Sequence, residues 1–285
     1  MMSNRFKNYI STRFPGKVRS PAEATAKGAG AFTDAHETRL IQHFEGRVAF
    51  DGSAPVLPYG LVILAFTNRS GSNMLADYLR QTRKVTGLGE YLNHVTTIKQ
   101  TTEKKIDSFP DYVAHLAGSL TRDNQQFGVK ASAEQLRFLK RWRITDMFQK
   151  VSVVHVHRDD LLAQAVSLWI AVQTGQWTSL QKRHSDDVSV DLDAITAITR
   201  DITTEDGLIR QFCGFEGLNY VSLSYEEVIA DVSAAVKRVG ASVGFDASKV
   251  KFKAPRIGKQ ASDLNEQILT QLRQHLRQWP DGDAG

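Results

Sequence analysis

The sequence predicts an α/β fold in which helices flank a parallel central sheet, and three observations support this class. Residues 61–66 (LVILAF) form a continuous apolar run without polar alternation, which is typical of a strand buried on both faces of a parallel sheet. Further strand-like segments alternate with segments of helical periodicity, the order that a parallel sheet with crossover helices requires. No internal repeat or low-complexity block points to another architecture.

The predicted elements follow one another along most of the chain. Residues 34–37 (DAHE) fit a capping box that begins a helix extending to about residue 48, and residues 132–135 (SAEQ) fit another. After the strand at 61–66 and a polar loop, the helical spacing of apolar residues begins at Met74. The remaining strands are predicted at 127–131, 151–156 and 220–224, and the remaining helices at 106–120, 132–148, 160–174, 191–212, 225–239 and 262–279.

The chain is predicted to have two parts. Residues 1–55 read as a basic leader and linker with one helix, because residues 20–32 are rich in Ala, Gly and Ser. Pro55 and Pro58 close this leader just before the first strand. Residues 56–285 form the main domain.

The composition excludes several classes of protein. With 285 residues, 41% hydrophobic and 24% charged, it is that of an ordinary globular protein. No apolar run approaches the roughly 18 residues that a membrane span needs. The single cysteine, Cys213, cannot form an internal disulfide, which favours a reducing cytoplasm as the location. No His/Cys cluster has metal-ligand spacing, so no metal is expected.

Positive charge gathers at the start of the chain. The net charge of the whole chain is +5, and an equal excess lies within residues 1–19. The basic residues there are Arg5, Lys7, Arg13, Lys17 and Arg19. We expect this segment to be a tail or to pack on a partner subunit, and weak contact with the inner membrane surface is the alternative. Nucleic acid is not an expected partner, because no aromatic-interleaved basic stripe follows.

The loop after the first strand, residues 67–73 (TNRSGSN), has the pattern of a phosphate-binding turn. The start of a helix has backbone N–H groups without partners and a partial positive charge. Gly71 lets the backbone approach an anion, and Arg69 adds a forked cation. A nucleoside-triphosphate loop would read GxxxxGK[ST], and its lysine and magnesium-holding hydroxyl are missing here. We therefore expect an anion site without a metal, with an ordinary capped turn as the alternative.

A second cation is predicted at the end of a neighbouring strand. Arg158 follows the strand at 151–156, and Ser167 lies further along in the helix that comes next. Ligands of parallel sheets bind at the carboxyl ends of the strands. Taken alone, Arg158 could pair with a neighbouring aspartate and Ser167 could be a small packing residue. Beside the first loop, however, two cationic sites suit a nucleotide that is phosphorylated at both ends.

Five segments of this chain resemble those of sulfotransferases that use 3′-phosphoadenosine 5′-phosphosulfate (PAPS), and they follow one another in the same order as in that family. The resemblance is to the bacterial carbohydrate type, which includes trehalose 2-sulfotransferase and nodulation-type lipopolysaccharide sulfotransferases. The segments are 68–73 (NRSGSN), 89–92 (GEYL), 127–130 (FGVK), 158–177 with QAVSLW and QTGQW, and 223–227 (LSYEE). The resemblance implies a sulfotransferase domain over residues 56–285, with a P-loop nucleotide-hydrolase-like fold.

The resemblance also implies a role for each matching position. PAPS, and PAP as its product, would be held by Asn68, Arg69, Ser70, Gly71, Ser72, Asn73, Arg158, Ser167, Arg256 and Lys259. The catalytic residues would be Glu90, as general base for the acceptor hydroxyl, and Arg69, which would stabilise the leaving phosphate. The acceptor would contact Tyr91, Gln173 and Trp177.

The acceptor implied by the resemblance is a hydroxyl group on a sugar, a glycolipid or a lipid-linked small molecule, and a homodimer is one expected assembly. Asn73 stands where the family usually has threonine, and Asn68 where proline or glutamine is common. Two other functions stay open. A small-molecule kinase with a degenerate P-loop would need magnesium, and a non-catalytic nucleotide-binding interaction protein would bind PAP without transferring sulfate.

Overall fold

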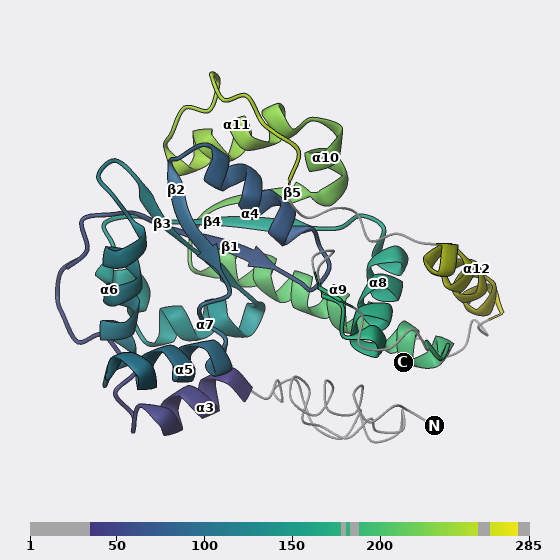
Figure 1. Cartoon of the computed structure of the whole chain (residues 1–285), viewed down its shortest axis with the longest axis horizontal. Coiled ribbons are helices and arrows are strands. Elements are labelled where there is room, and N and C mark those ends of the chain that lie inside the picture. Colours follow the sequence, from purple (N-terminus) through teal and green to yellow (C-terminus); the bar gives the residue numbers. More distant parts are fainter. Residues whose placement is uncertain (1–34, 178–180, 183–187, 256–262, 279–285) are drawn as a thin grey trace.

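The computed structural model describes residues 35–177, 181–182, 188–255 and 263–278, and it has the predicted α/β architecture. Five parallel strands form one sheet in the order β2-β3-β1-β4-β5 (Figure 1). The strands are β1 (Leu61–Phe66), β2 (Val85–Gly89), β3 (Gln126–Ala131), β4 (Val151–His157) and β5 (Asn219–Ser224).

Helices cover both faces of the sheet. They are α3 (Ala35–His43), α4 (Ser72–Gln81), α5 (His94–Lys104), α6 (Phe109–Leu120), α7 (Ala133–Arg141), the 3₁₀ turn η1 (Ile144–Met147), α8 (Leu161–Thr174), α9 (Leu192–Phe215), α10 (Tyr225–Ala230), α11 (Val232–Val243) and α12 (Asp263–Arg277). None of the described helices is both long and apolar enough to cross a membrane.

The apolar run of β1 is explained by its central place in the sheet. Leu61, Ile63 and Ala65 belong to the core on the side of α6, α7 and α9, whereas Val62 and Leu64 belong to the core on the side of α4 and α11. All six residues of the strand are buried. A strand that lies between two such layers is expected to be apolar on both faces.

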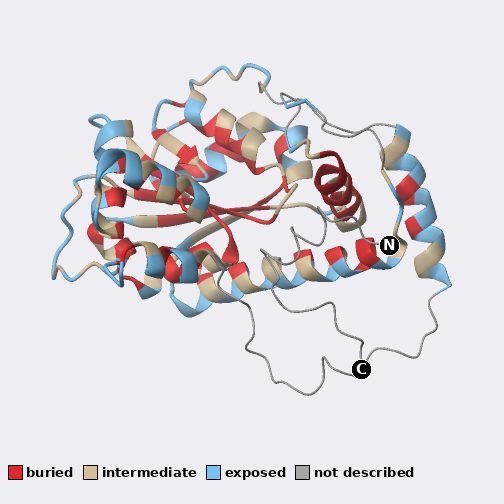
Figure 2. Cartoon of the chain, turned by 60° about the horizontal axis from the view of Figure 1, so that its bottom comes forward, coloured by how far each residue is buried: buried red, intermediate tan, exposed pale blue. Residues whose placement is uncertain are grey.

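Helix α8 is buried along most of its length (Figure 2). It packs with α9 and α12 in a third core cluster that contains Trp169, whose indole N–H donates to the Ser189 carbonyl at 2.8 Å. From Gln164 to Thr174 every residue is buried except Ser167, which is half-buried. The break in burial at Ser167 marks where α8 meets a cavity described below.

Several predicted boundaries were wrong, each for a local reason. The helix predicted over 34–48 ends at His43, because Glu45 (φ 52°) and Gly46 (φ 82°) are left-handed. The helix predicted over 132–148 ends at Arg141, and Arg143 (φ 57°) separates it from η1. The helix predicted over 225–239 is two helices, and the extended Asp231 between them caps the second. Strand β2 and helix α5 were not predicted.

Helix α3, which the sequence assigned to the leader, packs on the main core. Leu40 and Phe44 are almost fully buried, and the Phe44 ring meets the Phe109 ring edge-on at 5.9 Å. Arg141 of α7 donates to both carboxylate oxygens of Glu37, at 2.9 and 3.0 Å. The division of the chain near residue 55 stays a prediction.

Candidate active site

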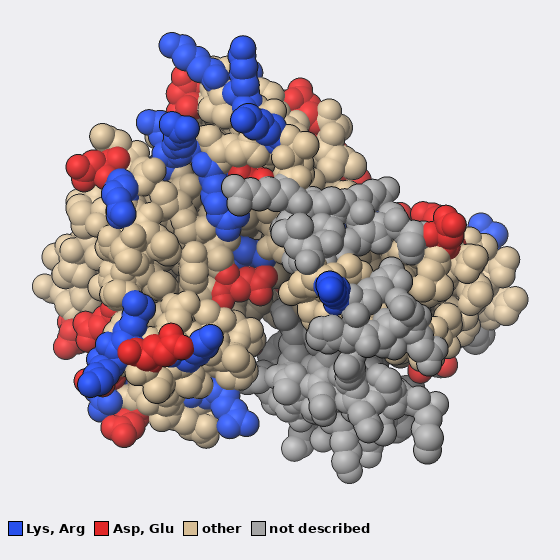
Figure 3. All heavy atoms as spheres, in the orientation of Figure 1, with Lys and Arg blue, Asp and Glu red and all other residues tan. Residues whose placement is uncertain are grey.

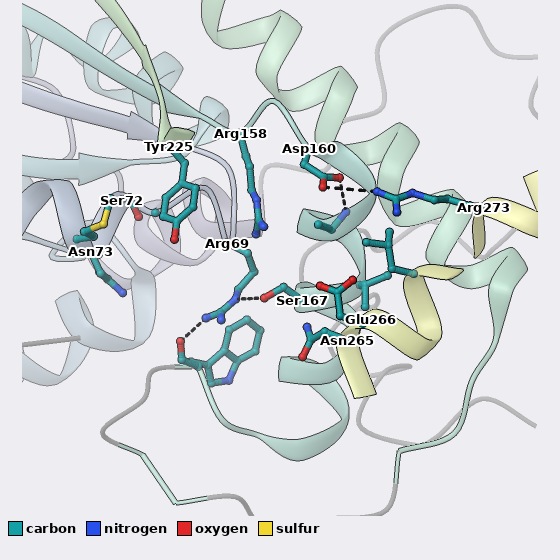
Figure 4. A pocket seen from close by; sticks show the side chains of 16 residues that line it. Arg69, Ser72, Asn73, Arg158, Asp160, Ser167, Tyr225, Asn265, Glu266 and Arg273 are labelled. Carbon is teal, nitrogen blue, oxygen red and sulfur yellow. Dashed lines mark hydrogen bonds and ion pairs between the residues drawn. The ribbon is translucent and has the colours of Figure 1, made fainter. Parts of the chain in front are cut away.

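The turn between β1 and α4 has a tightly curled backbone. Arg69 (φ 65°) and Gly71 (φ 85°) both adopt the left-handed conformation, which is uncommon for a residue with a side chain. A Cβ atom on Gly71 would lie 2.5 Å from Cδ2 of Tyr225, so glycine is required by the backbone angle and by the packed ring. Helix α4 then begins at Ser72, and its first turn faces the same side as Arg69 (Figure 4).

Gln164 of α8 holds this turn from behind. Its side-chain amide donates to the Thr67 hydroxyl at 2.9 Å and to the Asn68 carbonyl at 2.7 Å. The Gln164 side chain is fully buried. Buried hydrogen bonds of this kind fix the position of the turn without contacting what binds in front of it.

A cavity of about 310 Å³ lies in front of the turn. Arg69 points into it and donates from Nε to the Ser167 hydroxyl at 3.0 Å, and from Nη1 to the Trp177 carbonyl. Arg158 enters from the end of β4, with its guanidinium 5.3 Å from the centre of the Tyr225 ring. Figure 4 shows both arginine side chains extending into this cavity.

The electrostatics of the cavity favour an anion. Burial, and then the positive charge of Arg158, lower the pKa of Arg69. The Arg158 Nε atom is buried and makes no hydrogen bond within the described residues, and it forms an ion pair with the Glu226 carboxylate at 3.6 Å. Two half-buried cations that repel each other would be stabilised by a ligand carrying negative charge.

A buried lysine connects the turn to the end of β2. The Lys130 ammonium, on β3, donates to the Asn73 side-chain carbonyl and to the Glu90 carboxylate, both at 2.7 Å. It also lies 4.3 Å from the centre of the Phe66 ring. Burial lowers the pKa of Lys130, and the charge of Glu90 opposes this shift. The Lys130 side chain is 2% exposed and that of Glu90 is 53% exposed, so the carboxylate stays accessible to a ligand.

The structure brings most of the predicted site residues together. Arg69, Gly71, Ser72, Asn73, Arg158, Ser167 and Trp177 line the one cavity. Asn68 and Ser70 lie in the turn behind it, and Glu90 is joined to it through Lys130. Tyr91 is half-buried, and its carbonyl accepts from the Tyr112 hydroxyl at 3.0 Å.

Tyr91 is not in the lining of this cavity, and three further predicted residues are not placed at the site by the described structure. Gln173 is 7% exposed within α8 and is not part of the cavity lining. Arg256 and Lys259 lie outside the described residues. The roles assigned to all three stay predictions.

Sequence reasoning missed one wall of the cavity. Helix α12 contributes Asn265, Glu266 and Arg273, and Arg273 lies 3.9 Å from the Asp160 carboxylate at the start of α8. No sequence signal links α12 to the turn. Three other residues of the site lie in the segments that carry the family resemblance, so the resemblance could have identified them. They are Lys130, Gln164 and Tyr225. Across the described residues, no group of three or more His, Cys, Asp or Glu side chains could hold a metal ion.

Comparison with known proteins points to one family of enzymes. Residues 61–275 match the family model described as Stf0 sulphotransferase. The trehalose 2-sulfotransferase of Mycobacterium tuberculosis (strain ATCC 35801 / TMC 107 / Erdman) is 30% identical over 121 residues, which are 42% of this chain. The match spans 45% of that relative, less than half of its length.

Three solved sulfotransferase structures align with this chain at low identity and with TM-scores below 0.5. The sulfotransferase domain of the Synechococcus PCC 7002 olefin synthase aligns with 80% of this chain and 97% of its own, at 12% identity and a TM-score of 0.48. The sulfotransferase domain from the curacin biosynthetic pathway aligns with 76% of this chain and 98% of its own, at 12% identity and a TM-score of 0.44. Sulfotransferase STF1 from Mycobacterium tuberculosis H37Rv aligns with 82% of this chain and 75% of its own, at 13% identity and a TM-score of 0.40.

Proposed function

Because the chain belongs to the Stf0 sulphotransferase family, we propose that it transfers a sulfuryl group from PAPS to a hydroxyl group of a carbohydrate, free or lipid-linked. The observation that carries the proposal is the pair Arg69 and Arg158, whose guanidinium groups share one cavity. PAPS carries a phosphate at each end of its adenosine. The carbohydrate acceptor is suggested by the relative that acts on trehalose.

The residues around the cavity suit both ends of this donor. Arg69, the first turn of α4 and the curled backbone at Gly71 would hold the 5′-phosphosulfate, where the helix start adds partial positive charge. Arg158 and Ser167 would hold the 3′-phosphate. The Nε atom of Arg158 still has a proton to donate, and negative charge would offset the repulsion between the two arginines.

Bound PAPS supplies an activated sulfuryl group, and the side chains of this protein position and polarise the reactants. Glu90 would accept the proton of the acceptor hydroxyl, since its carboxylate is accessible. Lys130 orients Glu90 and ties it to Asn73, so the base and the donor site keep a constant separation. Arg69 would stabilise the negative charge that develops on the leaving phosphate. Trp177, 36% exposed at the cavity, offers an aromatic face to a sugar ring.

Calorimetry with two nucleotides tests the donor site. We expect PAP to bind in the presence of EDTA, and adenosine 5′-phosphate, which lacks the 3′-phosphate, to bind far more weakly. Arg158→Ala should weaken PAP binding by about 10- to 100-fold, the loss expected for a charge-assisted hydrogen bond, and should leave adenosine 5′-phosphate binding unchanged. Arg122→Ala, at an exposed position, is the matched control. Equal affinity for both nucleotides, or no heat with PAP, would refute the donor assignment.

Transfer of ³⁵S from labelled PAPS to a panel of sugars and glycolipids tests the reaction itself. Label in a product, formed without added magnesium, is expected. Tight PAP binding with no transfer to any extract of the source cells would instead support a non-catalytic nucleotide-binding protein.

A further inference from the structure

A band of exposed basic side chains lies on one face of the molecule, over the end of α4, the start of β2 and the segment 249–253 (Figure 3). It consists of Arg80, Arg83, Lys84, Lys249, Lys251 and Lys253. The Gln81 side chain joins two of these parts, since it exchanges hydrogen bonds with the main chain of Lys253 at 2.8 and 3.1 Å. Phe252 also packs edge-on against Tyr78 of α4, at 5.9 Å between ring centres. The band is therefore one surface, although it comes from distant parts of the sequence.

The charge of this band is balanced only in part: after the hydrogen bonds from Ser248, the positive charge of Lys249 also lowers the pKa of the Asp246 carboxylate in the same loop. Within the part of the chain that the structure describes, no ion pair involves any of its six basic residues. The Asp246 carboxylate, in the same loop, accepts from the Ser248 N–H at 2.8 Å and from its hydroxyl at 2.9 Å. A surface of one sign attracts ligands of the other sign and raises their local concentration.

The band leads to the proposed catalytic carboxylate. Arg80 donates from Nε to the Gly87 carbonyl and from Nη2 to the Leu88 carbonyl, both at 2.8 Å, and Glu90 follows two residues later. Burial is the main cause of the lowered pKa of Lys130, and the charge of Arg80 adds to it, so Arg80 acts electrostatically on the residue that holds Glu90. The positive surface is thus continuous with the acceptor side of the site.

A lipid bilayer fits this surface less well than a water-soluble polyanion. Proteins that bind a bilayer surface usually add apolar side chains that enter it. The exposed large apolar side chains of the described residues lie outside the band, and they are Ile41, Val56, Val95, Trp177, Val190, Phe215 and Ile229. The band offers charge alone.

We propose that the acceptor is an anionic oligosaccharide, one whose sugar units carry carboxylate or phosphate groups beside their hydroxyls. Its chain would lie along the band, with the reacting hydroxyl at Glu90. This inference rests on the proposed sulfotransferase function and narrows its acceptor class. Charge complementarity over the band would select such chains over neutral sugars and would make binding depend on salt.

Binding of matched oligosaccharides to the full-length protein tests the band. The probes are a fluorescent oligogalacturonate of eight units and a neutral maltooligosaccharide of the same length, measured by fluorescence polarisation from 50 to 300 mM NaCl. We expect the oligogalacturonate to bind, with an affinity that falls as salt rises, and the neutral chain to bind at least tenfold more weakly. The triple variant Lys249→Gln, Lys251→Gln, Lys253→Gln should bind the oligogalacturonate about tenfold more weakly, the combined loss expected for three exposed ion pairs.

The control is a second triple variant on another face, Lys99→Gln, Lys104→Gln, Lys105→Gln on and next to α5, which should bind as the wild type does. Equal loss in both variants, or equal binding of the neutral chain, would overturn the proposal. So would binding of vesicles of 30% phosphatidylserine through the three band lysines without binding of the oligogalacturonate, since that result assigns the band to a membrane.

A competition assay separates this inference from the proposed function. With equimolar anionic and neutral chains, ³⁵S from PAPS should enter the anionic chain, and the band variant should raise its KM without lowering kcat. Label entering only the neutral chain would overturn the anionic acceptor and leave the sulfotransferase intact. Absence of PAP binding would overturn the sulfotransferase, whereas the loss of oligogalacturonate affinity in the band variant would still be measured.

Discussion

Glu90→Gln is the substitution that most directly tests the mechanism. Glutamine keeps the size of the side chain and can still accept the hydrogen bond from Lys130, but it cannot take a proton from a hydroxyl at neutral pH. Since a positioned general base contributes about 10²- to 10⁴-fold, we expect kcat to fall by that factor. PAP affinity should not change, because Glu90 lies outside the lining of the arginine cavity.

The same substitution has a calculable effect on stability. Removing one partner of a fully buried ion pair costs about 3–5 kcal/mol. Here Lys130 is 2% exposed but Glu90 is 53% exposed, and solvent screens such a pair, so we expect a loss of about 1–2 kcal/mol in the free energy of unfolding. The folded pKa of Lys130 lies below its ordinary value of 10.5, so the unfolded chain binds more protons between these two values and stability rises with pH there. Without Glu90 the folded pKa of Lys130 falls further. The difference in the free energy of unfolding between the wild type and Glu90→Gln should therefore shrink as pH rises toward 10.

Three measurements check these expectations. They are ³⁵S transfer at saturating acceptor, calorimetry with PAP, and urea denaturation at pH 7 and pH 9.5. Glu103→Gln, at an exposed position on α5, is the control and should match the wild type in all three. A kcat of Glu90→Gln within about threefold of the wild type would remove Glu90 as the general base, given the size of effect that a base supplies.

Three further substitutions probe the supports of the site. Gly71→Ala should destabilise the protein by about 1–3 kcal/mol and weaken PAP binding, because alanine is strained at φ 85° and its Cβ would clash with Tyr225; an unchanged melting temperature would contradict this. Gln164→Leu should raise the Kd for PAP at least fivefold although Gln164 lies behind the turn, because the Thr67 hydroxyl and the Asn68 carbonyl lose the hydrogen bonds that they accept from it. Calorimetry with PAP, at an equal fraction of folded protein, checks this. Asp201→Asn should stabilise the protein by about 1–2 kcal/mol at pH 7, because burial, and then the charge of Glu205, raise the pKa of Asp201 to about 6. A carboxyl group with a raised pKa lowers the free energy of unfolding as pH rises from 3.8 to about 6. Urea denaturation at pH 3.5 should therefore show no gain in stability for the variant.

Much of the fold could be predicted because its signals are local. The run at 61–66 is apolar on both faces because β1 lies between two helical layers. A strand buried in this way can be recognised from its residue types alone. Strand β2 escaped prediction because VTGLG contains two glycines and is only partly buried at the edge of the sheet. The helix break at Asp231 depends on one residue that is extended and also caps α11, and periodicity cannot detect it.

The candidate anion-binding turn was also a local feature. Arg69, Gly71 and the polar residues around them are adjacent in sequence, and a strand followed by a helix brings their donors to one point without any help from the rest of the chain. A second cation at the end of a neighbouring strand could be inferred in the same way, since parallel strands share one carboxyl edge.

The sequence by itself therefore determined the class of the fold, the turn that is the candidate anion site and the candidate residues at the strand ends. Only the tertiary structure decided which of them meet: Lys130 reaches Asn73 and Glu90 across 57 and 40 positions of the chain, and Arg69 reaches Ser167 across 98. The reason is that local periodicity reports whether a residue is buried, whereas the neighbour it is buried against depends on the order of strands in the sheet and on how α8 and α12 pack beside them.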